Sequence, residues 1–81
     1  MKKADGLNIA LGNTVKVLRN NKGLTQEELA ERCDTSAVYI SEIERGIKQP
    51  TFRTVYIISK ALDLKLHQFV KKVESNLTNE D

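Results

Sequence analysis

The chain has 81 residues and a formal net charge of +2, and 30% of its residues are charged and 40% apolar. This length fits one small domain, and the composition is typical of a globular fold rather than of a disordered chain. Because there is no apolar run of about 18 residues and no signal segment, we expect neither a membrane span nor secretion. Cys33 is the single cysteine, which excludes an internal disulfide and favours a reducing compartment.

The charges are distributed unevenly along the chain. Residues 1–24 hold five bases and one acid, residues 25–46 hold six acids and two bases, and residues 47–81 hold six bases and four acids. If the chain binds a polyanion, the basic flanks must hold the phosphates while the carboxylates between them turn away. The simpler alternative is that these charges only solvate the surface.

Helical periodicity dominates the sequence, and no alternating strand pattern is present. A first helix, from about residue 8 to 21, is predicted by an apolar stripe of Leu7, Leu11, Val15 and Leu18. Gly12 weakens this helix by roughly 1 kcal/mol relative to Ala, and Gly23 ends it. Residues 1–6 are expected to form a flexible N-terminus.

A second helix is predicted from about residue 25 to 33. Thr25 and Glu28 form a T-x-x-E capping box, and Leu29, Ala30 and Cys33 face inward. Only residues 34 and 35 separate this helix from the next one, which Ser36 begins. Two short helices joined by so tight a turn must cross at a steep angle.

The third helix is predicted from about residue 36 to 45, before Gly46. Pro50 and the cap Thr51 then begin a fourth helix, from about residue 51 to 62, and a fifth follows from about 66 to 75. The folded domain is expected over residues 7–74, with a polar tail at 76–81. The predicted fold class is all-α, a compact bundle of five helices.

The third helix has an inner and an outer face. At about 100° per residue, Ile40 and Ile43 share the inner face. The outer face carries Ala37, Val38, Ser41, Glu42 and Arg45, with Tyr39 on its flank. Such a helix on the outside of a two-helix unit has a shape that enters a DNA major groove. The same shape could present a protein-docking surface.

The run GLTQEELAERCDTSAVYISEIERG, followed by KQP and TFRTVYIISKALDL, resembles the phage-repressor type of helix-turn-helix domain, the Xre/Cro-like family. The resemblance covers about residues 9 to 72. Its signature is Q-x-x-L-A at the start of the second helix, I-S-x-I-E-R-G in the third, and a Pro before the fourth. It implies a lambda-repressor-like fold that binds operator DNA as a symmetric dimer and controls transcription.

The resemblance also implies roles for single residues. Ser36, Ala37, Val38, Ser41 and Glu42 match the base-facing positions. Phosphate contacts are expected from Gln26, Tyr39, Arg45, Lys48, Gln49 and Arg53. Arg19 and Glu44 match a pair that forms an ion pair between the first and third helices of relatives. Glu44 therefore need not face DNA.

This sequence departs from the family pattern at three places. Asp34 occupies the turn where relatives usually have Gly, and Asp tolerates left-handed geometry better than most residues. Ala37 and Val38 replace polar side chains; they can pack only on thymine methyls, while Glu42 can accept a hydrogen bond from cytosine N4. Lys65 stands where Ser or Thr often caps the fifth helix.

Other residues that could carry chemistry are better explained as structural. Cys33 falls on an apolar position, and His67 has no ligand residues at metal spacing. Glu27 and Glu28 are adjacent and diverge on a helix, so they cannot work as an acid and base pair. No catalytic triad or phosphate loop is visible. We expect no enzyme activity, metal or cofactor.

The sequence therefore predicts a cytoplasmic, nucleoid-associated regulator, bacterial or phage-encoded, that binds a pseudo-palindromic double-stranded operator as a homodimer. The dimer is expected to form through the fifth helix and nearby apolar residues, among them Ile57, Leu62 and Leu64. No small-molecule effector is expected. A phage-type repressor and a restriction-modification controller protein both fit. The alternative is a protein-interaction module, such as an antitoxin or adaptor.

Overall fold

The computed structural model describes residues 4–77, and it contains five helices there and no strand. They are α1 (Ala4–Asn21), α2 (Gln26–Cys33), α3 (Ala37–Glu44), α4 (Phe52–Ala61) and α5 (Leu66–Ser75). The predicted all-α bundle is confirmed. The other residues, 1–3 and 78–81, include parts of the predicted flexible N-terminus and polar tail, which therefore lie outside the described chain.

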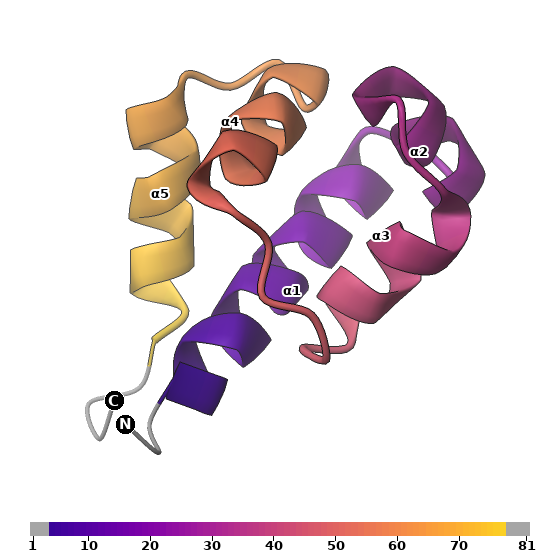
Figure 1. The fold of residues 1–81 in the computed structure, drawn as a ribbon. Coiled ribbons are helices and arrows are strands. Elements are labelled where there is room, and N and C mark those ends of the chain that lie inside the picture. The colour runs from indigo at the N-terminus through magenta and orange to yellow at the C-terminus, as the bar shows by residue number, and fades with distance from the viewer. Residues whose placement is uncertain (1–3, 78–81) are drawn as a thin grey trace.

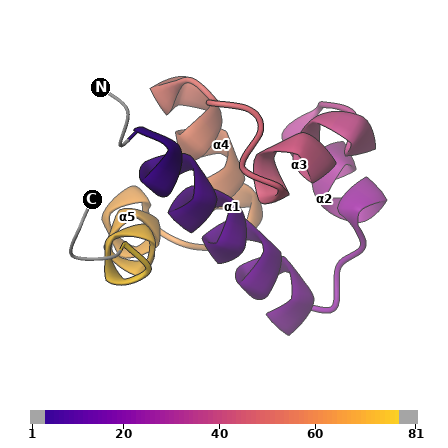
Figure 2. The same cartoon turned by 90° about the horizontal axis from the view of Figure 1, so that it is seen from below.

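Helix α1 is the axis of the bundle. Figures 1 and 2 show α2 and α3 on one side of α1 and α5 on the other, with α4 closing the gap. Helix α1 packs against α3 and α5, α2 packs against α3 and α4, and α4 packs against α5. The core between them is apolar and includes Val15, Leu29, Ile40, Ile58 and Phe69, each fully buried. This arrangement leaves the outer face of α3 uncovered.

The N-terminal caps predicted for three helices are confirmed. The Thr25 hydroxyl accepts a hydrogen bond from the amide of Glu28, whose carboxylate accepts one from the amide of Thr25. Ser36 and Thr51 cap α3 and α4 in the same way, through the amides of Tyr39 and Thr54. Each cap satisfies a backbone donor that the first helical turn leaves without a partner.

Two turns depend on a left-handed residue other than glycine. Asp34 ends α2 with φ 57° and ψ 47°, as its place in the tight turn predicts. The amide of Thr35 donates to the carbonyl of Ala30 (2.9 Å), which closes the turn between α2 and α3. Asp63 adopts φ 62° between α4 and α5, which the sequence did not indicate.

Helix α1 begins at Ala4, about four residues before the expected start. Residues 4–7 therefore extend the helix instead of forming a terminal segment. The helix starts at α5 and α4 lie close to their expected positions. At α5, the amide of Lys65 donates to Gln68 Oε1 (2.9 Å) in place of a hydroxyl cap.

Several large apolar side chains lie outside the core. Phe52 is 71% exposed, Leu7 48% and Val70 42%. Conversely Leu62, which we expected near a dimer surface, is only 3% exposed and belongs to the core. Cys33 is half-buried and packs against the core. Periodicity identifies the apolar face of a helix. The packing of the neighbouring helices decides how much of that face is buried.

Candidate nucleic-acid interface

Helices α2 and α3 form a compact unit with α3 on its outside. Each helix has eight residues, and the left-handed turn at Asp34 sets their mutual angle. Leu29 and Ala30 of α2 and Ile40 and Ile43 of α3 are buried between the helices and α1. The inner face of α3 is thereby fixed by packing, and its outer face has a fixed direction.

The five predicted base-facing residues lie at the start of α3 and along its first two turns, and Ala37 also packs against the core. Val38 is 67% exposed and Ser36 is exposed, while Ala37, Ser41 and Glu42 are partly exposed. The Ser36 oxygen accepts the bond from the Tyr39 amide (3.1 Å), so its hydroxyl hydrogen remains free to donate outward. The surface carries two hydroxyls, one carboxylate and two apolar groups.

The cationic residues predicted to contact phosphates surround the loop between α3 and α4. Arg45, Lys48 and Arg53 are exposed, as is Gln49. Gly46 takes φ 76°, and the amide of Ile47 donates to the carbonyl of Glu42 (3.0 Å). This bond folds the loop back onto the end of α3. Tyr39 is partly buried and packs against the core, with its amide held by the Ser36 cap.

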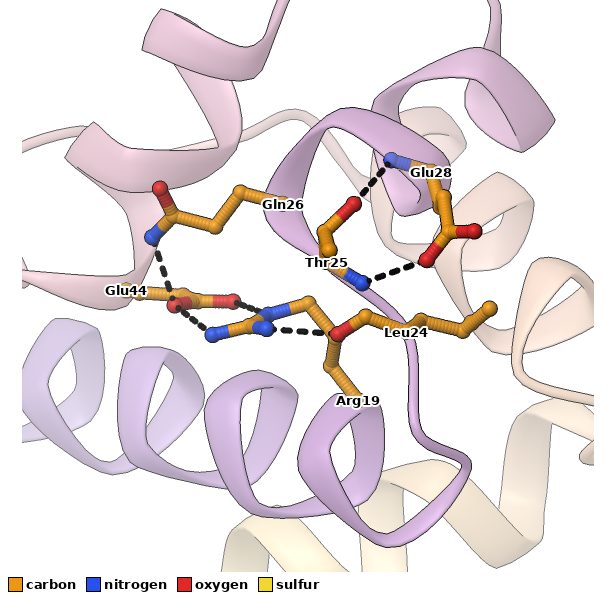
Figure 3. A network of polar contacts seen from close by, with 6 residues as sticks. All are labelled: Arg19, Leu24, Thr25, Gln26, Glu28 and Glu44. Atoms are coloured by element: carbon orange, nitrogen blue, oxygen red, sulfur yellow. Dashed lines mark hydrogen bonds and ion pairs between the residues drawn. The ribbon is translucent and has the colours of Figure 1, made fainter.

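Arg19 of α1 and Glu44 of α3 form an ion pair (Figure 3). Arg19 Nε donates to Glu44 Oε2 at 2.7 Å and Nη2 donates to Oε1 at 3.1 Å. The two side chains are only 10% and 3% exposed. The hydrogen bond to Glu44 raises the pKa of Arg19, and Nη1 donates to the carbonyl of Leu24 (2.7 Å). Glu44 therefore adds no free carboxylate to the surface.

Gln26 at the start of α2 joins this pair. Its Nε2 donates to Glu44 Oε1 at 3.0 Å, and Figure 3 shows the amide reaching across from α2 to the carboxylate. Residues 26 and 44 are on different helices, so sequence spacing gave no sign of this bond. Gln26 remains partly exposed. The network thus connects α1, α2 and α3 beside the N-terminus of α2.

Gly12 is the second feature that the sequence interpretation missed. A Cβ at residue 12 would lie 2.7 Å from the carbonyl oxygen of Glu44 and closer still to that of Ile43. The two helix backbones therefore touch at this crossing, which brings Arg19 within reach of Glu44. A glycine inside a helical pattern is the signal that could have indicated such a contact.

The acids of α2 gather around one depression on the surface. A shallow surface depression is lined by Glu27, Glu28, Ala30, Glu31, Asp34, Thr35 and Ala37. Glu28 is engaged in the capping box. Elsewhere, burial raises the pKa of the Cys33 thiol. Within the described chain, no three His, Cys, Asp or Glu side chains are placed so that they could hold a metal ion, and none of the helices there could span a membrane.

The chain is similar to proteins named as regulators of transcription. It is 44% identical over 52 residues to the uncharacterized HTH-type transcriptional regulator y4dJ of Sinorhizobium fredii, covering 64% of this chain and 68% of that protein. It is 36% identical over 62 residues to the control protein C.BamHI of Bacillus amyloliquefaciens, covering 75% and 76%.

A solved structure matches as well. The restriction-modification controller protein C.Esp1396I, as a tetramer in complex with its natural 35 base-pair operator, superposes with a TM-score of 0.80 at 30% identity, over 86% of this chain and 92% of that chain. The family model for the helix-turn-helix, HTH_3, matches residues 15–69. The chain therefore belongs to the helix-turn-helix family of transcriptional regulators to which the resemblance pointed.

Proposed function

We propose that this protein is a sequence-specific regulator of transcription that places α3 in the major groove of a double-stranded operator. The observation that carries the proposal is the outer face of α3, which is fixed by the buried Ile40 and Ile43 and flanked by exposed cations. Its exposed polar and apolar groups are of the kinds that contact base edges and thymine methyls. The operator complex of C.Esp1396I supports the same use of the fold.

The residue roles divide into two sets. Ser36, Ala37, Val38, Ser41 and Glu42 read bases; Gln26, Tyr39, Arg45, Lys48, Gln49 and Arg53 hold the sugar–phosphate backbone. The cations position the protein and carry no sequence information. Because the reading face has few donors, methyl contacts and DNA shape supply much of the specificity.

The protein acts as a homodimer on a pseudo-palindromic site, since one helix makes too few base contacts for high specificity. The dimer surface is an apolar groove of about 280 Å³ between the start of α1, the start of α4 and α5. It is lined by Leu7, Asn8, Leu11, Gln49, Pro50, Phe52, Val55, Val70 and Val73. Exposed apolar side chains at its rim are typical of a protein-protein interface. Such a dimer could act as a repressor or as a restriction-modification controller. Its site of action is the cytoplasm, on bacterial or phage DNA.

The test is to select duplexes from a random pool and to measure binding of the selected duplex against salt. The cations Arg45, Lys48 and Arg53 of two protomers should give a log–log slope of about −5. A single enriched, symmetric sequence is expected.

The second candidate is a protein-interaction module, favoured by the acidic depression on α2. Failure of a dimer of known concentration to bind any duplex at low salt would contradict the DNA-binding proposal and favour this one.

A further inference from the structure

The orientation of the Gln26 amide is set by its neighbour. Glu44 Oε1 accepts hydrogen bonds from Arg19 Nη2 (3.1 Å) and from Gln26 Nε2 (3.0 Å). A carboxylate has only acceptors, so it can hold the Gln26 amide only through the NH2 group and not through Oε1. Glu44 thereby sets the orientation of the Gln26 amide group.

The Gln26 amide has further bonding capacity. Its NH2 group carries two hydrogens, of which Glu44 takes one, and its side chain is partly exposed at the first residue of α2. The N-terminus of a helix favours anions because its backbone amides have no helical partners. A phosphate placed there would meet the second amide hydrogen beside the end of the helix.

Arg19 neutralises the Glu44 carboxylate, which would otherwise lie as a free negative charge close to the proposed DNA surface. Glu44 is 8% exposed and its charge is matched by a guanidinium that bonds both of its oxygens. A lone carboxylate at this place would repel a phosphate. Paired with Arg19, it can hold Gln26 without opposing the anion.

We propose that Glu44 is a positioning residue for DNA: it holds the Gln26 amide ordered before binding, with its free N–H directed at one phosphate of each half-site. This inference rests on the proposed function. Preordering removes the loss of side-chain freedom that a mobile glutamine would suffer on binding. Arg19 neutralises the charge of Glu44, Glu44 orients the Gln26 amide, and Gln26 contacts the phosphate.

The first measurement uses the free wild-type protein. Side-chain ¹⁵N relaxation should show the Gln26 NH2 group restricted on the ps–ns timescale, whereas that of the exposed Asn20 should be mobile. A Gln26 amide as mobile as that of Asn20 would overturn the inference. The double variant R19M/E44L replaces the pair by apolar side chains of similar size, a change that buried ion pairs often tolerate. In it, the Gln26 amide should become mobile while the backbone spectrum stays that of a folded protein.

The second measurement uses the duplex that the wild type selects, with single phosphates replaced by neutral methylphosphonates. Neutralising the phosphate at Gln26 in one half-site only should weaken wild-type binding about tenfold, the loss expected for one hydrogen bond to a charged group. Gln26→Ala and R19M/E44L should both lose most of this sensitivity, at that phosphate only. A purely structural ion pair would leave the sensitivity unchanged in R19M/E44L.

The outcomes separate the inference from the proposed function. If the wild type selects no duplex, both fail. If it selects one and R19M/E44L keeps the full sensitivity at the Gln26 phosphate, only the inference fails. Should R19M/E44L not fold, Glu44→Asp gives the same comparison, because it keeps the charge beside Arg19 and withdraws the carboxylate from Gln26 by one methylene.

Discussion

Gly12 of α1 lies against the backbone of Glu44 at the end of α3, so close that a Cβ at residue 12 would be 2.7 Å from the Glu44 carbonyl oxygen. This contact places the two helices at the distance that the Arg19–Glu44 ion pair bridges. The crossing of α1 and α3 thus depends on the absence of a side chain.

Gly12→Ala should destabilise the protein although Ala is the better helix former by about 1 kcal/mol. The added methyl meets backbone atoms, which cannot move aside as a side chain can, and overpacking of this kind costs about 1–3 kcal/mol. Urea unfolding measures the difference. Asn13→Ala, at the exposed neighbouring position, is the control and should be neutral or stabilising. A Gly12→Ala variant more stable than the wild type would show that the helices can separate freely.

Arg19→Met should lower the free energy of unfolding by about 3–5 kcal/mol, because it leaves the buried Glu44 carboxylate without its charged partner. The double variant R19M/E44L should recover much of that loss, since it removes both charges. The two variants are compared by urea unfolding at one pH. If the double variant is no more stable than Arg19→Met, the unpaired Glu44 carboxylate is not the source of the loss.

Val38 and Lys48 should differ in what they recognise. Replacing a contacted thymine by uracil removes one methyl, which should cost the wild type about 0.8 kcal/mol, and Val38→Ala should make binding less sensitive to that change. Lys48→Ala should weaken all duplexes alike and reduce the salt slope by about one unit. Binding measured over a set of operator variants decides between them. Equal losses on every sequence for both variants would refute the division into base-reading and phosphate-holding residues.

Phe52→Glu should yield a monomer at concentrations where the wild type is a dimer, because it places a charge in the apolar groove of Leu7, Phe52 and Val70. Affinity for a symmetric operator should fall with it. Analytical ultracentrifugation measures the first effect. Val17→Glu is the matched control, since Val17 is exposed (54%) but does not line the groove. If the Phe52→Glu variant remains a dimer, the interface does not lie at this groove.

Asp63 should contribute to stability in a pH-dependent way. Its carboxylate is 2.7 Å from Lys22 Nζ, and the hydrogen bond to Lys22, followed by the charge of Lys22, lowers the pKa of Asp63. A pKa lower in the folded than in the unfolded state gives a contribution that is present above the unfolded value, about 3.9, and is lost as the pH falls through the folded value. Asp63→Asn, which retains a residue suited to the left-handed turn, should thus be less stable than the wild type at pH 7, and the difference should vanish as the pH falls below the folded pKa of Asp63. Urea unfolding at several pH values gives the comparison, and a difference independent of pH would assign the effect to the turn.

The sequence by itself determined the number and order of the helices, three of their caps and the left-handed turn at Asp34. These features depend on residues within a few positions of one another: a hydroxyl and the amide three residues on, or apolar side chains one turn apart. It also carried the family resemblance and the set of outward residues on α3. The same local rules gave the start of α1 too late, because the extra turn at Ala4 has no cap signal.

Only the tertiary structure decided which of those residues meet across the fold. Gln26 and Glu44 are 18 residues apart on different helices, so their contact follows from how the helices pack. The Arg19–Glu44 pair, 25 residues apart, was expected only because relatives have it, and no local pattern indicated it. The same packing requires Gly12 at the α1–α3 crossing, buries Leu62 and leaves Phe52 and Val70 exposed. A periodic pattern fixes the direction of a side chain on its own helix, whereas the distance to the next helix depends on every side chain between them.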